Sequence, residues 1–178
     1  MAGEQTETGR ADAGSAAGPA PPPAEGFYEG ERNAAGEEEG HGVCRYKNGD
    51  EYTGEWKAGR KHGKGTYRYE NGAEYEGEYV EDTREGRGQY RYASGALYDG
   101  EYRADRKHGQ GKFTFASGNV YQGGWAADKM EGRGTFRYAN GDLYEGDYKA
   151  DKKEGWGKFR YADGGAFTEA AACCIGLP

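Results

Sequence analysis

The sequence predicts an all-β fold, an elongated single-layer antiparallel sheet of consecutive β-hairpins preceded by a disordered tail. Three observations lead to this prediction. First, 34 of the 178 residues are glycine, far above the usual ~7%. Second, every aromatic residue lies between Phe27 and Phe167, and all five prolines lie outside that span. Third, aromatic residues recur every 23 residues from Tyr52 to Phe167, and a fixed period of this length is typical of stacked repeats.

This periodicity divides the chain into three parts. Residues 1–26 are rich in Pro, Ala, Gly and acidic residues, a composition typical of a disordered tail. Residues 27–167 form the repeat array, and residues 168–178 form a short end piece in which the pattern breaks. We divide the array into six units, of which the first is one residue longer than the others: 28–51, 52–74, 75–97, 98–120, 121–143 and 144–166.

Each unit is expected to carry two short strands. In the second unit the first strand reads Tyr-Thr-Gly-Glu-Trp over 52–56, and the second reads Gly-Thr-Tyr-Arg-Tyr over 65–69. A polar loop over 57–63 would join them, and a three-residue loop over 70–72 would lead to the next unit. That loop places Gly72 in a left-handed conformation, which glycine adopts freely. It pairs Tyr67 with Tyr75, which keeps all aromatic side chains on one face of the sheet.

The two faces then have different chemistry. Alternation places Glu55 and Arg68 on the face opposite the rings, where cross-strand ion pairs between such residues would keep it hydrated. The aromatic face is expected first to be the core of the fold. Because a single layer cannot bury one face completely, part of it is also predicted to hold a partner strand or helix. The residues of this predicted partner-binding face are Tyr52, Trp56, Tyr75, Tyr79, Tyr98, Tyr102, Tyr121, Trp125, Tyr144 and Tyr148.

Charge and cysteine content narrow the class of protein. The net charge of −7 belongs to residues 1–51, and residues 52–166 are close to neutral. A nucleic-acid-binding domain would carry a basic patch, so we expect no nucleic-acid partner. Three cysteines are an odd number without a disulfide pattern, which favours a reducing, intracellular location. Cys173 and Cys174 leave three alternatives open, a palmitoylated end, a terminal cap and an unstructured end.

No catalytic, metal or cofactor site is predicted. His41, His62 and His108 recur in the predicted polar loops, but His62 and His108 are two units apart, roughly 19 Å by strand spacing. That distance excludes shared coordination of a metal ion, so we assign these residues loop hydrogen bonds. The repeated Gly-x-Gly lacks the third glycine and the helix of a dinucleotide fingerprint. We therefore expect a protein that is not an enzyme.

Pairs of basic residues recur in the same predicted loops. Contact with anionic lipid headgroups is one interpretation, worth about 1 kcal/mol per charge near a membrane surface. A solvated loop is the favoured alternative, because neighbouring acidic residues nearly cancel the charge. The residues concerned are Arg60, Lys61, Arg106, Lys107, Lys152 and Lys153.

The repeated pattern Tyr-x-Gly-Glu-Trp/Tyr, Gly-x-Gly-x-aromatic and Asn-Gly at a 23-residue period resembles the MORN repeat (membrane occupation and recognition nexus). This resemblance covers 28–166 and implies an elongated antiparallel sheet that does not catalyse a reaction. The irregular first unit, with Tyr28, Gly40 and Gly42, is similar to the opening unit of MORN proteins of the ciliary radial spoke head. The chain lacks the long acidic C-terminal tail of those proteins.

That narrower resemblance implies a cytoplasmic, cytoskeletal scaffold that binds axonemal proteins in motile cilia or flagella. Three alternatives remain open at this point. The chain could be a peripheral adaptor at phosphoinositide-bearing membranes, or a module that regulates an enzyme in trans, and it could form a homodimer or a higher assembly.

Overall fold

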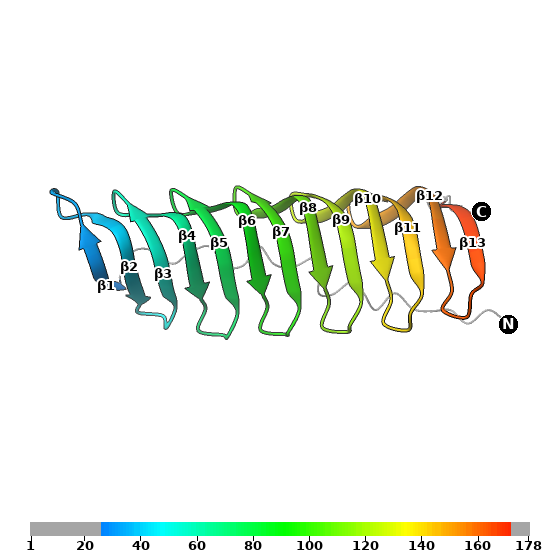
Figure 1. Cartoon of the computed structure of the whole chain (residues 1–178), viewed down its shortest axis with the longest axis horizontal. Coiled ribbons are helices and arrows are strands. Elements are labelled where there is room, and N and C mark those ends of the chain that lie inside the picture. The colour runs from blue at the N-terminus through cyan, green and yellow to red at the C-terminus, as the bar shows by residue number, and fades with distance from the viewer. Residues whose placement is uncertain (1–25, 172–178) are drawn as a thin grey trace, which may run out of the picture.

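The computed structural model describes residues 26–171 and contains one continuous antiparallel sheet (Figure 1). Its 13 strands lie side by side in chain order, and neighbouring strands are hydrogen-bonded throughout. This confirms the predicted all-β array of consecutive hairpins. Most of the predicted tail, together with Cys173 and Cys174, lies outside the described residues, and Gly26 is the first residue of β1.

The strands alternate between two lengths along the array. Each first strand of a unit spans 7 residues and each second strand 9 residues, up to the shorter last strand. Their bounds are β1 Gly26–Arg32, β2 Glu38–Tyr46, β3 Glu51–Lys57, β4 Arg60–Arg68, β5 Glu74–Val80, β6 Thr83–Arg91, β7 Leu97–Arg103, β8 Arg106–Thr114, β9 Val120–Ala126, β10 Lys129–Arg137, β11 Leu143–Lys149, β12 Lys152–Arg160 and β13 Ala166–Ala171.

The loop between units has the predicted register. Tyr67 pairs with Tyr75, and the amide of Tyr69 donates to the carbonyl of Ala73 at 2.9 Å, which closes a three-residue loop. Gly72 adopts a φ of 85°, the left-handed conformation that this loop requires. The faces of the strands follow from this register, and the buried aromatic residues share one of them. Phe27 is an exception to the prediction, since it pairs with Arg45 on the opposite face.

The connection within each unit differs from the prediction. No seven-residue loop is present, because β3 and β4 continue into this segment and only Ala58 and Gly59 separate them. Both residues have positive φ angles, 47° and 76°, as in a type I′ hairpin turn. The predicted loop histidines His62 and His108 therefore lie in strands, opposite Glu55 and Glu101. The first unit is the exception, since 33–37 form a longer connection between β1 and β2.

Glycine also bends every second strand. Opposite Gly54 and Glu55 of β3, the strand β4 carries two extra residues, Gly63 and Lys64. Gly63 has a φ of 56°, and the carboxylate of Glu55 accepts the amide proton of Lys64 at 2.9 Å. The bulge recurs at the same place in later units and turns the upper part of each hairpin over the aromatic face (Figure 1).

This geometry corrects the predicted ion pair between Glu55 and Arg68. Glu55 caps the bulge instead, and Arg68 contacts Glu74 at 2.9 Å and Glu51 at 3.7 Å on the neighbouring strands. The array also extends beyond its predicted end at residue 167. β13 pairs with β12 through Ala171, so the sheet has one strand more than six two-strand units provide.

Candidate functional site

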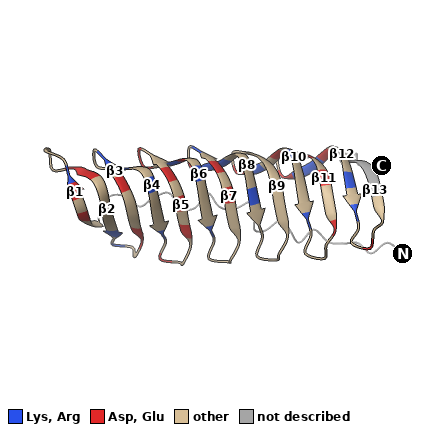
Figure 2. Cartoon of the chain, viewed as in Figure 1, with Lys and Arg blue, Asp and Glu red and all other residues tan. Residues whose placement is uncertain are grey.

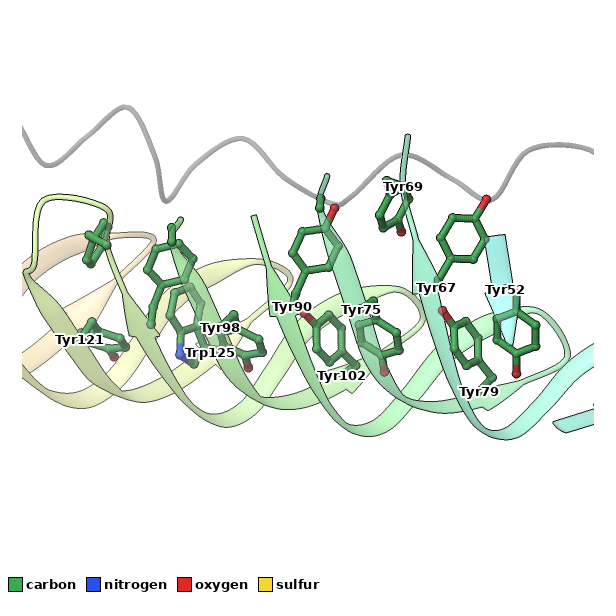
Figure 3. Packing of buried hydrophobic residues seen from close by; sticks show 14 of the residues in the cluster. Tyr52, Tyr67, Tyr69, Tyr75, Tyr79, Tyr90, Tyr98, Tyr102, Tyr121 and Trp125 are labelled. Carbon is green, nitrogen blue, oxygen red and sulfur yellow. The ribbon is translucent and has the colours of Figure 1, made fainter. Parts of the chain in front are cut away.

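The ten aromatic residues predicted to bind a partner form the core of the array. Each is at most 7% exposed, and their rings contact one another edge to face without a break. For example, Tyr52 meets Trp56 at a ring-centroid distance of 5.1 Å and Tyr79 at 5.3 Å, with interplanar angles of 86° and 85°. We call this series the first ring file: Trp56, Tyr52, Tyr79, Tyr75, Tyr102, Tyr98, Trp125, Tyr121, Tyr148 and Tyr144. Figure 3 labels the members from Tyr52 to Tyr121.

The tyrosines of this file pack over a row of glycines in the sheet. We call it the glycine row: Gly54, Gly65, Gly77, Gly88, Gly100, Gly111, Gly123, Gly134, Gly146 and Gly157. A β-carbon at Gly65 would lie 2.2 Å from the hydroxyl oxygen of Tyr52, and one at Gly111 would lie 2.4 Å from that of Tyr98. The Tyr52 hydroxyl donates to the carbonyl of Glu55 at 3.0 Å. Edge-to-face contacts of this kind stabilise a fold beyond their buried area. Binding of a partner through the ten rings stays a prediction, and their burial leaves such a partner little ring surface to contact.

A second ring file runs parallel to the first. Tyr67 and Tyr69 lie 4.6 Å apart, Tyr69 and Tyr90 lie 5.7 Å apart, and this spacing repeats along the array. Figure 3 shows Tyr67, Tyr69 and Tyr90 above the first file. The exposure of this file rises toward the C-terminal end, where Tyr161 is 49% exposed. Its members are Tyr46, Tyr67, Tyr69, Tyr90, Tyr92, Phe113, Phe115, Phe136, Tyr138, Phe159 and Tyr161.

Between the two files lies a row of side chains, three of which the sequence analysis had assigned to polar loops. Lys61, Arg84 and Lys107 are 3%, 4% and 1% exposed, and Met130 and Lys153 occupy the same position in the next two units. We call this position the cation slot. The Lys107 nitrogen lies 4.7 Å from the ring centroid of Trp125 and 4.9 Å from that of Phe113, within the range of cation–π attraction.

The slot follows from the length of the turn within the unit, which the sequence did not predict. Because the turn within the unit has only two residues, Lys61 pairs with Trp56 and shares its inward face. The sequence analysis predicted a loop of seven residues here and therefore did not predict this pairing. The same error affects the predicted lipid contacts, since Lys61 and Lys107 point inward and cannot reach a membrane surface.

The remaining basic residues of the predicted lipid-binding set are exposed but not brought together into one basic patch. Arg60 contacts Glu81 at 2.9 Å. Lys153, at the C-terminal end of the slot, donates to the hydroxyl of Tyr138 at 2.8 Å and lies 4.5 Å from the ring centroid of Tyr144. Arg106 and Lys152 are exposed next to the two-residue turns. Lipid contact through these residues stays a prediction.

Each buried cation is held by the turn of the following unit. The Arg84 guanidinium contacts the carboxylate of Asp105 at 3.1 Å, and the backbone amide of Arg84 donates to the same oxygen at 2.9 Å. Asp82 and Asp128 hold Lys61 and Lys107 through the same amide contact, at 3.0 and 2.9 Å. The cation slot therefore joins consecutive units as well as filling the space between the ring files.

Burial changes the proton affinity of these groups. Desolvation lowers the pKa of Lys107 to about 8, although the nearby Asp128 opposes the change. Arg84 is subject to the same desolvation, but attraction to Tyr69, Tyr102 and Asp105 outweighs it and raises the pKa of the guanidinium. Desolvation raises the pKa of the ring-file tyrosines, for example Tyr52, Tyr98 and Tyr121. These shifts follow from the burial of the groups in the core of the array.

The described residues contain no group of three or more His, Cys, Asp or Glu side chains that could hold a metal ion. Across 26–171 no helix is long and apolar enough to span a membrane.

A search of the curated proteins found no match. Among solved structures, the TCP domain of Drosophila melanogaster SAS-4, in complex with a proline-rich motif of Ana2, is similar at 13% identity and a TM-score of 0.47. The match covers 78% of this chain and 75% of that one. The TCP10 domain of Danio rerio CPAP, in complex with a STIL peptide, matches at 14% identity and a TM-score of 0.40, with 80% and 74% coverage. Similarity at this level assigns no partner to this chain.

The comparison with protein families gives a definite result. The model of the MORN repeat matches six contiguous segments, 34–51, 52–74, 75–97, 98–120, 121–143 and 144–166. These segments contain most of the ring files, the glycine row and the cation slot described above. The chain therefore belongs to the MORN repeat family.

Proposed function

We propose that this protein is a non-catalytic scaffold that holds partner proteins in register in the axoneme of motile cilia or flagella, with a role like that of the MORN proteins of the radial spoke head. The observation that carries the proposal is the outer face of the sheet, opposite the ring files. It presents the same backbone positions at every unit over all 13 strands. A ladder of this kind offers a repeating set of contacts to a long or repeating partner.

The ciliary assignment depends on the irregular first unit. In this unit 33–37 replace the two-residue turn of the others, and Asn33 organises them by accepting the amide protons of Ala35 and Glu37 at 2.9 and 3.0 Å. The resemblance to spoke-head proteins lies in the sequence of this same unit. The loop gives the N-terminal end of the array a shape that the other units lack.

The proposal is tested by localising the tagged full chain in ciliated cells and isolating axonemes. We expect the protein to stay with axonemes after detergent extraction and to be released by high salt, because polar contacts on the outer face are screened by ions. Replacement of 33–37 by the Ala-Gly of the second unit provides a matched variant. Absence of the wild-type chain from cilia would refute the ciliary role, whereas loss of axonemal retention in the loop variant alone would assign the contact to the first unit.

A further inference from the structure

The outer face carries two continuous rows of side chains. Strand pairing defines both, since each member lies opposite the next on the neighbouring strand. Row A consists of Phe27, Arg45, Glu51, Arg68, Glu74, Arg91, Leu97, Thr114, Val120, Arg137, Leu143 and Arg160. Row B consists of Glu29, Val43, Thr53, Thr66, Glu76, Gln89, Asp99, Lys112, Gln122, Thr135, Glu145 and Lys158.

The charges of these rows follow two patterns. Within rows A and B, the first strands of the units carry acids, except for the uncharged β9, and the second strands carry bases. Figure 2 shows this difference for β3, β5 and β7 against β8, β10 and β12. In addition, rows A and B contain more acids than bases over β1–β5 and more bases than acids over β8–β12. The four acids of the first half are Glu29, Glu51, Glu74 and Glu76, and the four bases of the second half are Lys112, Arg137, Lys158 and Arg160.

These patterns select among the ways in which two copies of the sheet can meet face to face. A two-fold axis along the array would place each strand on itself, so that Glu76 would face Glu76 and Lys112 would face Lys112. An axis parallel to the strands and passing through β7 would set Arg45 against Arg160 and Arg68 against Arg137. Like charges in direct opposition cost several kcal/mol at an interface, so both arrangements are disfavoured.

An axis parallel to the strands but between β6 and β7 gives the opposite result. It places β1 on β12, β2 on β11 and so on, which sets every acidic strand on a basic one. Rows A and B then contain no like-charge pair. The opposed pairs include Glu51 with Arg137, Glu29 with Lys158 and Glu76 with Lys112, and two-fold symmetry makes each of them twice.

The ends and the centre of the face fit this arrangement. Phe27, which is 68% exposed, comes to face Arg160. Near the axis, Leu97 of each copy lies beside the Leu97 of the other. Twelve strands at ~4.8 Å spacing, with the roughly 13 Å of straight strand below the bulge, give about 750 Å² per copy. This is close to the roughly 800 Å² per partner of a standard specific interface.

From this complementarity we infer that the occupant of the outer face is a second copy of this chain, packed face to face by a two-fold axis that lies parallel to the strands between β6 and β7. The interface is mostly polar, so its affinity depends on ionic strength. The inference is independent of the ciliary location, because the purified chain alone tests it. Since it concerns the same outer face, a partner protein of the proposed scaffold would compete with this dimer.

Sedimentation equilibrium measures the mass of the full chain independently of its elongated shape. At about 0.05 M salt and high protein concentration we expect a mass twice the 19.4 kDa of the monomer, and at about 0.5 M salt, where charges are screened within ~5 Å, a shift toward the monomer. Glu76→Lys and Lys112→Glu each replace two opposed pairs by like-charge pairs. Each is expected to weaken association at least about tenfold.

The double variant Glu76→Lys/Lys112→Glu exchanges the two charges and restores complementarity only if the residues face each other across the two-fold axis. Its association should return to within about threefold of wild type. Glu76, Lys112 and the control Lys129 are all exposed, so circular dichroism should show the same fold for every variant. Lys129→Glu, outside both rows, should dimerise as wild type does.

Three results would overturn the inference. The first is a chain that stays monomeric at low salt, which would leave the outer face to a different protein. The second is unchanged dimerisation in both single variants. The third is a double variant as weak as the single ones, which would mean that Glu76 and Lys112 do not oppose each other.

Discussion

Replacing Lys107, the most deeply buried cation, by methionine should stabilise the protein, because methionine occupies the equivalent position of the next unit. Lys107 is 1% exposed and Met130, 23 residues later, is 7% exposed in the equivalent position. Both backbone amides donate to the aspartate of the following turn, at 2.9 Å to Asp128 and 2.8 Å to Asp151. The array thus shows that the surroundings of the slot accept a thioether without rearrangement.

The magnitude follows from the pKa of Lys107, which desolvation lowers from 10.5 to about 8. At about 1.4 kcal/mol per pKa unit, holding this lysine protonated in the fold costs about 3 kcal/mol at neutral pH. The variant Lys107→Met removes that cost, but it also loses cation–π attraction worth about 1–2 kcal/mol in a desolvated site. The expected net gain in the free energy of unfolding at pH 7 is therefore about 1–2 kcal/mol.

The pH dependence separates this explanation from a general packing effect. Between about pH 8 and pH 10.5 the unfolded lysine binds more protons than the folded one, so wild-type stability rises with pH in this window. The methionine variant lacks this rise, and its advantage should shrink by about 1 kcal/mol between pH 7 and pH 9. Tyrosine contributions are common to both proteins and cancel in the difference.

Urea unfolding followed by tryptophan fluorescence at both pH values measures this difference. Lys129→Met, at an exposed position of β10 outside both rows, is the matched control and should change stability by less than about 0.5 kcal/mol. A Lys107→Met variant that is less stable than wild type at pH 7 would refute the reasoning. It would show that attraction to the rings and to Asp128 outweighs the desolvation of the ammonium group.

Three further predictions concern the core. Gly111→Ala, which places a β-carbon 2.4 Å from the Tyr98 hydroxyl, should lower the free energy of unfolding by about 3 kcal/mol, measured by heat or urea. Gly118→Ala, which is strained only in its φ of 87°, should lower it by about 1 kcal/mol. Equal losses in the two variants would contradict the close-approach argument. Asp105→Ala should lower the free energy of unfolding by about 3–5 kcal/mol, because it leaves the Arg84 guanidinium buried without its carboxylate. The control is Asp99→Ala, at an exposed position, which removes no such partner. Burial raises the pKa of Tyr52, Tyr98 and Tyr121, so stability is retained up to about pH 10 and then falls as the unfolded tyrosines ionise. Absorbance at about 295 nm should rise together with the loss of circular dichroism, and ionisation of most tyrosines in the folded chain would exclude this mechanism.

The fold could be predicted from the sequence because the features that define it depend on residues close together in the chain. The period of 23 residues, the alternation of aromatic and polar residues and the Gly72 loop all depend on neighbours within one unit. The pairing of Tyr67 with Tyr75 and the positive φ of Gly72 were confirmed for this reason. The common face of the aromatic residues followed from the same register.

The connection within the unit could not be predicted in this way. Ala-Asp at 104 and 105 is not a hairpin signature, and the left-handed φ of 48° at Ala104 is unfavourable for alanine. The turn exists because the unit before it supplies partners: the amide of Asp105 donates to the carbonyl of Arg84 at 3.1 Å and the amide of Ala104 to the carboxylate of Glu85 at 2.8 Å. Only the stacked array contains these contacts.

The repeat, the all-β ladder and the set of rings that share a face follow from the sequence alone, since side-chain alternation and turn chemistry act within about 23 residues. The burial of the ten predicted rings, in contrast, results from contacts between units, because neighbouring units cover them edge to face. The inward orientation of Lys61 and Lys107 likewise depends on the folded array, because a two-residue turn and a glycine bulge fold each hairpin over its own rings.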